Sequence, residues 1–146
     1  RVGHSYIKEA MIKYNALFAA ESSGHTYYRD YWHSDCGMIP AVQILEFLSE
    51  SGRKLSEVVK DVMNKYYISG EINNKIKDKE GKINEIAEKY KDAKQSRLDG
   101  IAIEYDDWRF CVRPANTESL LRLTLEAKSQ ELMEEKRDEV LALIRS

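Results

Sequence analysis

Hydrophobic and polar residues alternate with a period of two in three consecutive segments near the C-terminal end. These segments are 101–105, 108–113 and 121–127. Such a period puts hydrophobic side chains on one face of a strand and polar ones on the other, which predicts a sheet with one buried face. A helix with one hydrophobic stripe follows, and Ser129 is its expected N-cap. Helices on one face of a mostly antiparallel sheet form an α+β domain.

The first fifty residues predict a different set of elements, typical of part of an α/β domain. These are a helix over 4–15, a buried strand over 16–20, a polar loop over 21–25, a strand over 26–32 and a helix over 38–51. Ser5 is the expected N-cap of the first helix, and Pro40 fits the first turn of the last one. The apolar positions of that last helix are expected to face a core; they are Ile39, Val42, Leu45 and Leu48.

A polar break with glycine at residues 51–54 predicts a boundary between two domains, residues 1–52 and 53–146. A helix is expected to start near Ser56. The elements predicted after it are a strand over 66–76, a charged loop over 77–82 and a helix over 83–90 that frays through 91–97.

Composition mainly excludes classes of protein. The formal net charge of −2 lacks the basic excess typical of nucleic-acid binders. No hydrophobic run approaches the roughly 20 residues of a membrane span. Two cysteines make no disulfide framework, which favours a reduced, cytoplasmic setting. The chain opens on Arg1 rather than on a methionine, so we expect a fragment of a longer protein.

The first candidate for chemistry is the loop from Arg113 to Glu118, between two predicted strands. Arg113 can offer a fork of donors to a phosphate dianion, and Pro114 restricts the backbone beside it. Asn116 and Thr117 add side-chain donors. From the residues alone, a phosphate-binding loop and an ordinary surface turn are equally good interpretations.

The second candidate is the loop from Glu21 to His25. The Glu21 carboxylate can accept hydrogen bonds from two neighbouring sugar hydroxyls, and Ser23 and His25 can each add a donor or acceptor. From the residues alone, an ordinary surface loop is the favoured interpretation. A zinc site built on His33 and Cys36 is not expected, because no second matched pair of ligands follows. Cys111 is expected to be structural.

The two loops and their surroundings resemble the α-D-phosphohexomutase superfamily, specifically its bacterial phosphomannomutase/phosphoglucomutase group. The likeness runs along essentially the whole chain. The segments that carry it are Val2-Gly3-His4-Ser5 with Ile7-Lys8, Glu21-Ser22-Ser23-Gly24-His25 with Tyr28-Arg29-Asp30, Ser69-Gly70-Glu71-Ile72-Asn73, Leu98-Asp99-Gly100, Asp107-Trp108-Arg109-Phe110, and Arg113-Pro114-Ala115-Asn116-Thr117-Glu118 followed by Leu120-Leu121-Arg122. The chain departs from the family pattern at Ala20, Cys111, Ala115 and Ser119.

The resemblance implies the end of domain 3 followed by domain 4 of a four-domain protein, with a fold like that of the TATA-binding protein in domain 4. It also implies two groups of site residues. The sugar-binding residues are Glu21, Ser23, His25 and His4. The phosphate-binding residues are Arg113, Ala115, Asn116 and Thr117, where Ala115 lacks the hydroxyl that a serine would supply.

The resemblance further implies an enzyme that interconverts the 1-phosphate and 6-phosphate of a hexose. A phosphoserine in domain 1 would donate its phosphoryl group, Mg²⁺ held by domain 2 would assist, and glucose 1,6-bisphosphate would be the intermediate. Neither the serine loop nor the metal loop is found in this chain, so it is expected to be inactive alone. The expected partners are the hexose phosphate substrate, the missing N-terminal domains and, through an exposed sheet edge, a second copy. Phosphoglucosamine mutase, a non-catalytic sugar-phosphate binding module and a plain interaction domain are the alternatives.

Overall fold

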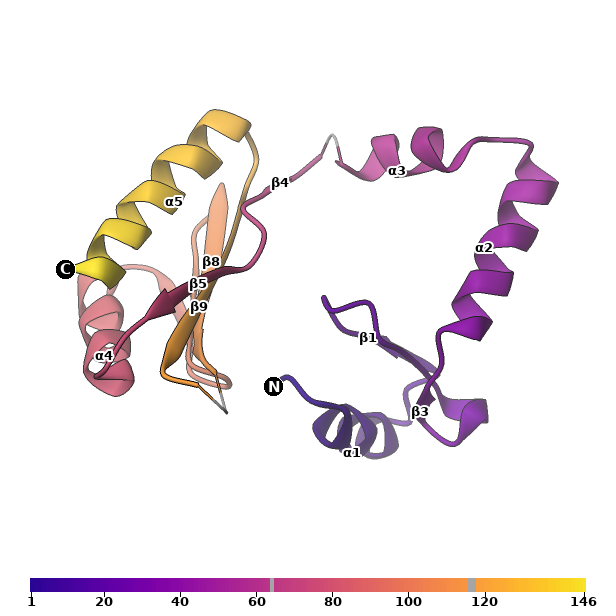
Figure 1. Ribbon diagram of the computed structural model, residues 1–146, viewed down its shortest axis with the longest axis horizontal. Coiled ribbons are helices and arrows are strands. Elements are labelled where there is room, and N and C mark those ends of the chain that lie inside the picture. Colours follow the sequence, from indigo (N-terminus) through magenta and orange to yellow (C-terminus); the bar gives the residue numbers. More distant parts are fainter. Residues whose placement is uncertain (64, 116–117) are drawn as a thin grey trace. The chain divides into compact units, whose positions relative to one another are not determined.

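The computed structural model describes residues 1–63, 65–115 and 118–146, and it divides into two compact units, Arg1–Val59 and Lys60–Ser146 (Figure 1). None of the helices in these described ranges is long and apolar enough to cross a membrane.

The first unit is a small antiparallel sheet with two helices and the start of a third. Its elements are α1 (His4–Tyr14), β1 (Phe18–Ala20), β2 (Thr26–Tyr28), a 3₁₀ turn (Arg29–Tyr31), β3 (Ser34–Asp35), α2 (Met38–Ser51) and α3 (Leu55–Met63), which runs on into the second unit. The sheet order is β1-β2-β3. Among the described side chains of this unit, only Met11 and Tyr27 are buried.

Two local predictions for this unit are wrong. The N-cap of α1 is Gly3, with φ of 126°, so His4 is already helical and Ser5 lies inside the first turn. The strand predicted to reach residue 32 ends at Tyr28, because the 3₁₀ turn follows directly and Trp32 and His33 both have positive φ.

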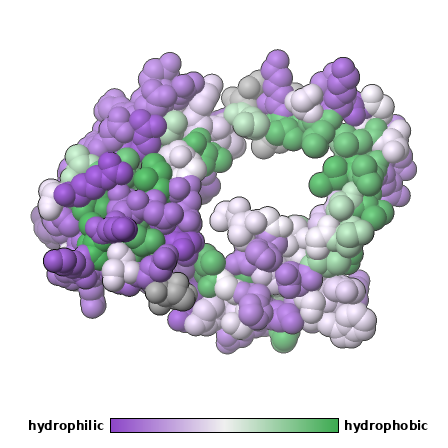
Figure 2. All heavy atoms as spheres, in the orientation of Figure 1, coloured by the Kyte–Doolittle hydropathy of each residue, from purple (hydrophilic) through white to green (hydrophobic). Residues whose placement is uncertain are grey.

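Helix α2 has the predicted bounds but not the predicted core. Pro40 lies in its first turn, as expected. The helix is described throughout and buries none of its residues; Val42 and Leu45, for example, are 58% and 64% exposed. Figure 2 shows hydrophobic residues gathered over α2, and a helix that is hydrophobic on most sides normally lies inside a protein. Ile39 and Leu48 are only half-buried, so the described residues of this unit do not supply the predicted core.

The second unit is one antiparallel sheet whose helices lie on one face (Figure 1). Its elements are β4 (Tyr67–Ile68), β5 (Ile72–Lys75), α4 (Lys79–Lys89), β6 (Lys94–Ser96), β7 (Ile101–Glu104), β8 (Trp108–Pro114), β9 (Leu120–Ala127) and α5 (Gln130–Arg145). The order is β4-β9-β8-β7-β6, with β5 also paired to β9. This arrangement confirms the predicted α+β class.

The core of the second unit lies between the sheet and α4 and α5. Alternate residues of β8 and β9 point into it, as the period of two predicts; these are Phe110, Val112, Leu121, Leu123 and Leu125. The helices add Ile83, Ile86, Val140 and Ile144. Full burial of one such side chain contributes about 1.5–3 kcal/mol, so this core stabilises the sheet that carries the second loop.

Three predictions for this unit are wrong in detail. The strand over 66–76 is two strands, because Gly70 with φ of 70° breaks it. Helix α4 begins at Lys79, since the Asp78 carboxylate accepts a hydrogen bond of 2.8 Å from the Gly81 N–H and caps the helix. The segment expected to fray contains β6, which pairs with β7.

Gly100 leads into β7 in a conformation that only glycine adopts easily. Its φ is 74°, and a Cβ atom placed on it would lie 2.2 Å from the Val112 carbonyl oxygen. The close approach of these two backbones therefore requires glycine at this position.

Candidate functional site

The loop from Glu21 to His25 is the turn that joins β1 to β2. The Glu21 N–H donates to the His25 carbonyl at 2.9 Å, and the Gly24 N–H donates to the Glu21 carbonyl at 3.0 Å. Gly24 has φ of 88°, which the reversal of the chain requires. The turn thus presents short polar side chains from a fixed backbone.

The Glu21 carboxylate is held on both of its oxygens. The Gly3 N–H donates to Oε1 at 3.0 Å and the Tyr27 hydroxyl donates to Oε2 at 2.5 Å. The hydrogen bond from Tyr27 is the main reason that the pKa of Glu21 is lowered, and the Gly3 N–H and the nearby histidines His25 and His4 act in the same direction. Burial beside this carboxylate raises the pKa of Tyr27 to about 12. Glu21 is therefore an ionised acceptor in a fixed orientation.

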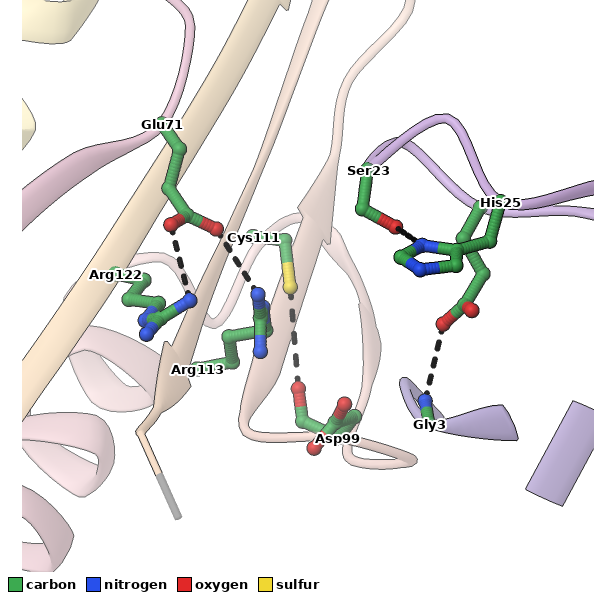
Figure 3. Close-up of polar contacts among 9 residues, drawn as sticks. Gly3, Ser23, His25, Glu71, Asp99, Cys111, Arg113 and Arg122 are labelled. Carbon is green, nitrogen blue, oxygen red and sulfur yellow. Dashed lines mark hydrogen bonds and ion pairs between the residues drawn. The ribbon is translucent and has the colours of Figure 1, made fainter. Parts of the chain in front are cut away.

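The other predicted sugar-binding residues lie around this carboxylate. His4 is exposed at the first turn of α1. The Ser23 hydroxyl and His25 Nδ1 are 2.8 Å apart, within the turn itself (Figure 3). A shallow pocket of about 140 Å³ opens beside the turn, and Ser23, His25 and Asp35 are among the residues that line it. The structure thus brings together Glu21, Ser23, His25 and His4.

The second predicted loop joins β8 to β9. Asn116 and Thr117 lie outside the described residues. Ala115 is buried, and its N–H donates to the Leu120 carbonyl at 2.9 Å. This amide extends the pairing of the two strands, so it is already engaged within the sheet and is not open to a ligand.

Lys79 ties the two ends of this loop together. Its Nζ donates to the carbonyl oxygens of Ala115 and Glu118, each at 3.2 Å. Lys79 is the first residue of α4, directly after the Asp78 cap, so the start of that helix sets its position. The loop therefore carries a positive charge from a residue some forty positions earlier in the chain.

Arg113 lies in a cluster of three charged side chains. Its Nη2 donates to Glu71 Oε2 at 2.9 Å, and Arg122 Nη1 donates to Glu71 Oε1 at 3.1 Å (Figure 3). Arg113 and Arg122 are directly paired in the register of β8 and β9. Glu71 comes from the segment between β4 and β5 and joins both arginines. All three side chains are partly exposed, so they can meet a ligand.

Cys111 does not offer a nucleophile. Burial raises the pKa of its thiol, and the Asp99 carboxylate acts in the same direction. A thiol with a raised pKa stays protonated and unreactive near neutral pH.

The described residues do not fit a metal ion. They contain no group of three or more histidine, cysteine, aspartate or glutamate side chains close enough to hold one. The Mg²⁺ that the resemblance implies would need ligands other than these.

Sequence reasoning missed four residues that this geometry singles out. Tyr27 and Lys79 gave no signal by type or spacing. Arg122 stood in the segment Leu120-Leu121-Arg122, which resembles the family. Glu71 stood in a segment that resembles the family, and it could have been considered as an ion-pair partner for the arginines.

Two family models match the chain. The domain described as "Phosphoglucomutase/phosphomannomutase, alpha/beta/alpha domain III" matches residues 1–66. The one described as "Phosphoglucomutase/phosphomannomutase, C-terminal domain" matches residues 71–143.

Relatives agree with these matches. The chain is 39% identical over 146 residues to phosphohexose mutases of Xanthomonas campestris pv. campestris, covering 98% of this chain and 33% of the relative. It is 41% identical over 144 residues to phosphomannomutase of Methanocaldococcus jannaschii, covering 99% and 32%. The chain thus spans about a third of the length of the curated relatives that it matches.

A solved structure supports the fold. The X-ray structure of a phosphoglucomutase/phosphomannomutase family protein from Burkholderia thailandensis aligns with a TM-score of 0.77 at 24% identity, covering 99% of this chain and 31% of that one. Since the family models cover nearly the whole chain, it belongs to the phosphoglucomutase/phosphomannomutase family, of which it matches domain III and the C-terminal domain.

Proposed function

We propose that this chain is the substrate-binding portion of a phosphohexomutase that acts as a phosphomannomutase/phosphoglucomutase. The observation that carries the proposal is the held carboxylate of Glu21, which two protein donors orient and which remains partly exposed. Each oxygen of an ionised carboxylate has about two acceptor positions, so each can still accept one sugar hydroxyl. Neighbouring hydroxyls of a hexose match this arrangement.

On the same proposal, Arg113 binds the phosphate that is not being transferred. In the free chain its Nη2 pairs with Glu71, and its guanidinium group carries further donors for the ligand. Asn116 and Thr117 are proposed to add side-chain donors. Lys79 contributes positive charge and holds the ends of the loop, because it binds the carbonyls on both sides of those two residues.

The activity of the whole protein is part of the same proposal. The phosphoserine and the Mg²⁺ ligands would be supplied by other domains, in a protein of the length of the relatives, in the cytoplasm. The residues described above would bind and orient the hexose phosphate and the proposed intermediate, glucose 1,6-bisphosphate.

The test compares the 146-residue chain with a protein of the relatives' length, each assayed with mannose, glucose and glucosamine 1-phosphates. We expect turnover of the mannose and glucose substrates by the longer protein and none by the chain alone. In the longer protein, Glu21→Gln and Arg113→Gln should each lower kcat/KM by at least about tenfold, since each removes a charged hydrogen bond to the substrate.

Arg109→Gln is the matched control, because Arg109 lies on the same face of β8 and pairs with Glu126 instead of Glu71. It should leave kcat/KM within about twofold of the value for the unsubstituted protein, because losing one half-exposed ion pair has a small effect. If the longer protein prefers glucosamine 1-phosphate, the proposed choice of mannose and glucose phosphates as substrates is wrong. If both site variants keep full activity, the proposed roles of the two loops are refuted.

A further inference from the structure

We infer that Arg113 and Arg122 form one paired-arginine anion site, that Glu71 occupies it in the free chain, and that a phosphate dianion binds there by displacing Glu71. The inference rests on the proposed function, because it takes Arg113 as a phosphate ligand. It adds a second arginine and an internal competitor to that site.

The first step is the register of the sheet. Arg113 on β8 is directly opposite Arg122 on β9. Like charges placed directly opposite one another on adjacent strands repel. Two guanidinium groups in this position favour an anion between them, and the Glu71 carboxylate takes that place.

The second step is the incomplete pairing that Glu71 provides. It accepts one hydrogen bond from each arginine, at 2.9 and 3.1 Å, and forms no bidentate pair with either. Among the described residues, Arg122 Nε is the one buried side-chain nitrogen or oxygen without a hydrogen-bond partner. A phosphate group has more acceptor oxygens than a carboxylate and carries more negative charge, so it can satisfy more of these donors.

The third step is that Glu71 can leave. It lies outside the strands, between β4 and β5, and follows Gly70, whose φ is 70° and which has open space around it. Its side chain is 37% exposed, and solvent weakens ion pairs of this kind. The free energy lost when Glu71 leaves is therefore small compared with the free energy gained when a dianion binds two arginines.

The experiment is a titration of the 146-residue chain with inorganic phosphate at constant ionic strength, followed by the side-chain Nε–Hε NMR signals of the arginines. Glu71→Gln keeps the shape of the side chain and removes its charge, so we expect it to tighten phosphate binding by about threefold or more. Glu126→Gln is the matched control, since it removes a carboxylate from the Arg109 pair on the same face of the sheet. It should change the dissociation constant by less than about twofold.

Arg122 is tested by two substitutions, in case one of them fails to fold. Both Arg122→Gln and Arg122→Lys should weaken phosphate binding, the lysine variant less so because it keeps the charge. The inference is overturned if Glu71→Gln binds phosphate no more tightly than Glu126→Gln does, or if both Arg122 variants bind like the unsubstituted chain.

Arg113→Gln separates this inference from the proposed function. If it weakens binding while Glu71→Gln fails to tighten it, the phosphate role of Arg113 stands and only the displacement of Glu71 is refuted. If Arg113→Gln has no effect, or if no arginine signal responds to phosphate, both are refuted.

Discussion

The hydroxyl of Tyr27, one of the two side chains buried among the described residues of the first unit, donates directly to Oε2 of Glu21. Tyr27 follows Glu21 by six positions and returns to it along β2, so the hairpin supplies both the carboxylate and the group that orients it. The orientation of the predicted sugar-binding residue therefore depends on a buried residue of the same hairpin.

Tyr27→Phe should raise the pKa of Glu21 towards its ordinary value, because the hydrogen bond from Tyr27 is the largest cause of the lowering. A carboxyl with a lowered pKa in the folded state adds stability above its unfolded pKa of about 4.3, and that stability is lost as the pH falls through the folded value. The stability difference between the two proteins should thus be present at pH 7, at about 1 kcal/mol, and vanish in acid.

The measurement is a carboxyl-detected NMR titration of both proteins, combined with urea unfolding at pH 7 and in acid. Tyr28→Phe is the control, since the Tyr28 hydroxyl bonds Gln43 and does not contact Glu21. An unchanged Glu21 pKa in Tyr27→Phe would show that the hydrogen bond does not control this carboxylate.

Gly100→Ala should destabilise the second unit by about 2 kcal/mol or more, since the new Cβ meets the Val112 carbonyl oxygen and the backbone has positive φ. Gly70→Ala is the matched comparison, because Gly70 also has positive φ but has nothing within 4 Å of the added Cβ. It should cost only about 1 kcal/mol. Urea denaturation of both variants checks the difference, and equal losses would mean that the close approach at Gly100 is unimportant.

Lys79→Met should weaken phosphate binding by roughly fivefold, because it removes a positive charge and two hydrogen bonds to the ends of the loop. The Ala115 amide should also exchange its hydrogen faster, since the strand end beside it loses its tie to α4. Lys91→Met is the control; Lys91 lies two residues after the end of α4 and pairs with Glu88 rather than with the loop. Unchanged exchange at Ala115 would contradict a role for Lys79 in holding the loop.

Leu45→Lys should reduce self-association of the chain. Helix α2 exposes Leu45 and Phe47 with other large apolar side chains, and contiguous apolar surface of this kind drives association. Analytical ultracentrifugation over a range of concentrations measures the effect, with Glu46→Lys as a control that changes the charge on the same helix without removing an apolar side chain. A chain that is monomeric before substitution would refute the prediction.

The second unit could be predicted well because its sequence carries its own core. The alternating side chains around Phe110 and Leu123 pack against helices of the same unit, so the pattern predicts their burial correctly. Ser129 caps α5, as expected, by accepting a hydrogen bond from the Leu132 N–H. The start of α4 was also available in the sequence, since Asp78 is a good cap residue. The charged residues around Asp78 are also typical of a loop, which hides this signal.

The first unit shows why the rest could not be predicted. The pattern of α2 correctly predicts a helix. An apolar helix face does not identify the element that packs against it, and the described residues of this unit leave that face largely exposed.

The ion pairs of Glu71 in the second unit were also beyond local patterns. They join residues that are 42 and 51 positions apart in the chain. The roles of Asn116 and Thr117 stay predictions.

The one-sided sheet of the second unit divides β8 into two independent sets of residues. Phe110 and Val112 point towards the helices, while Arg109, Cys111 and Arg113 occupy the other face. A substitution in the second set leaves the helix-facing core intact, so the unit can change the side chains of this face without rebuilding what keeps it folded. Cys111 belongs to this second set, so we expect natural variation to concentrate there rather than at Phe110 and Val112.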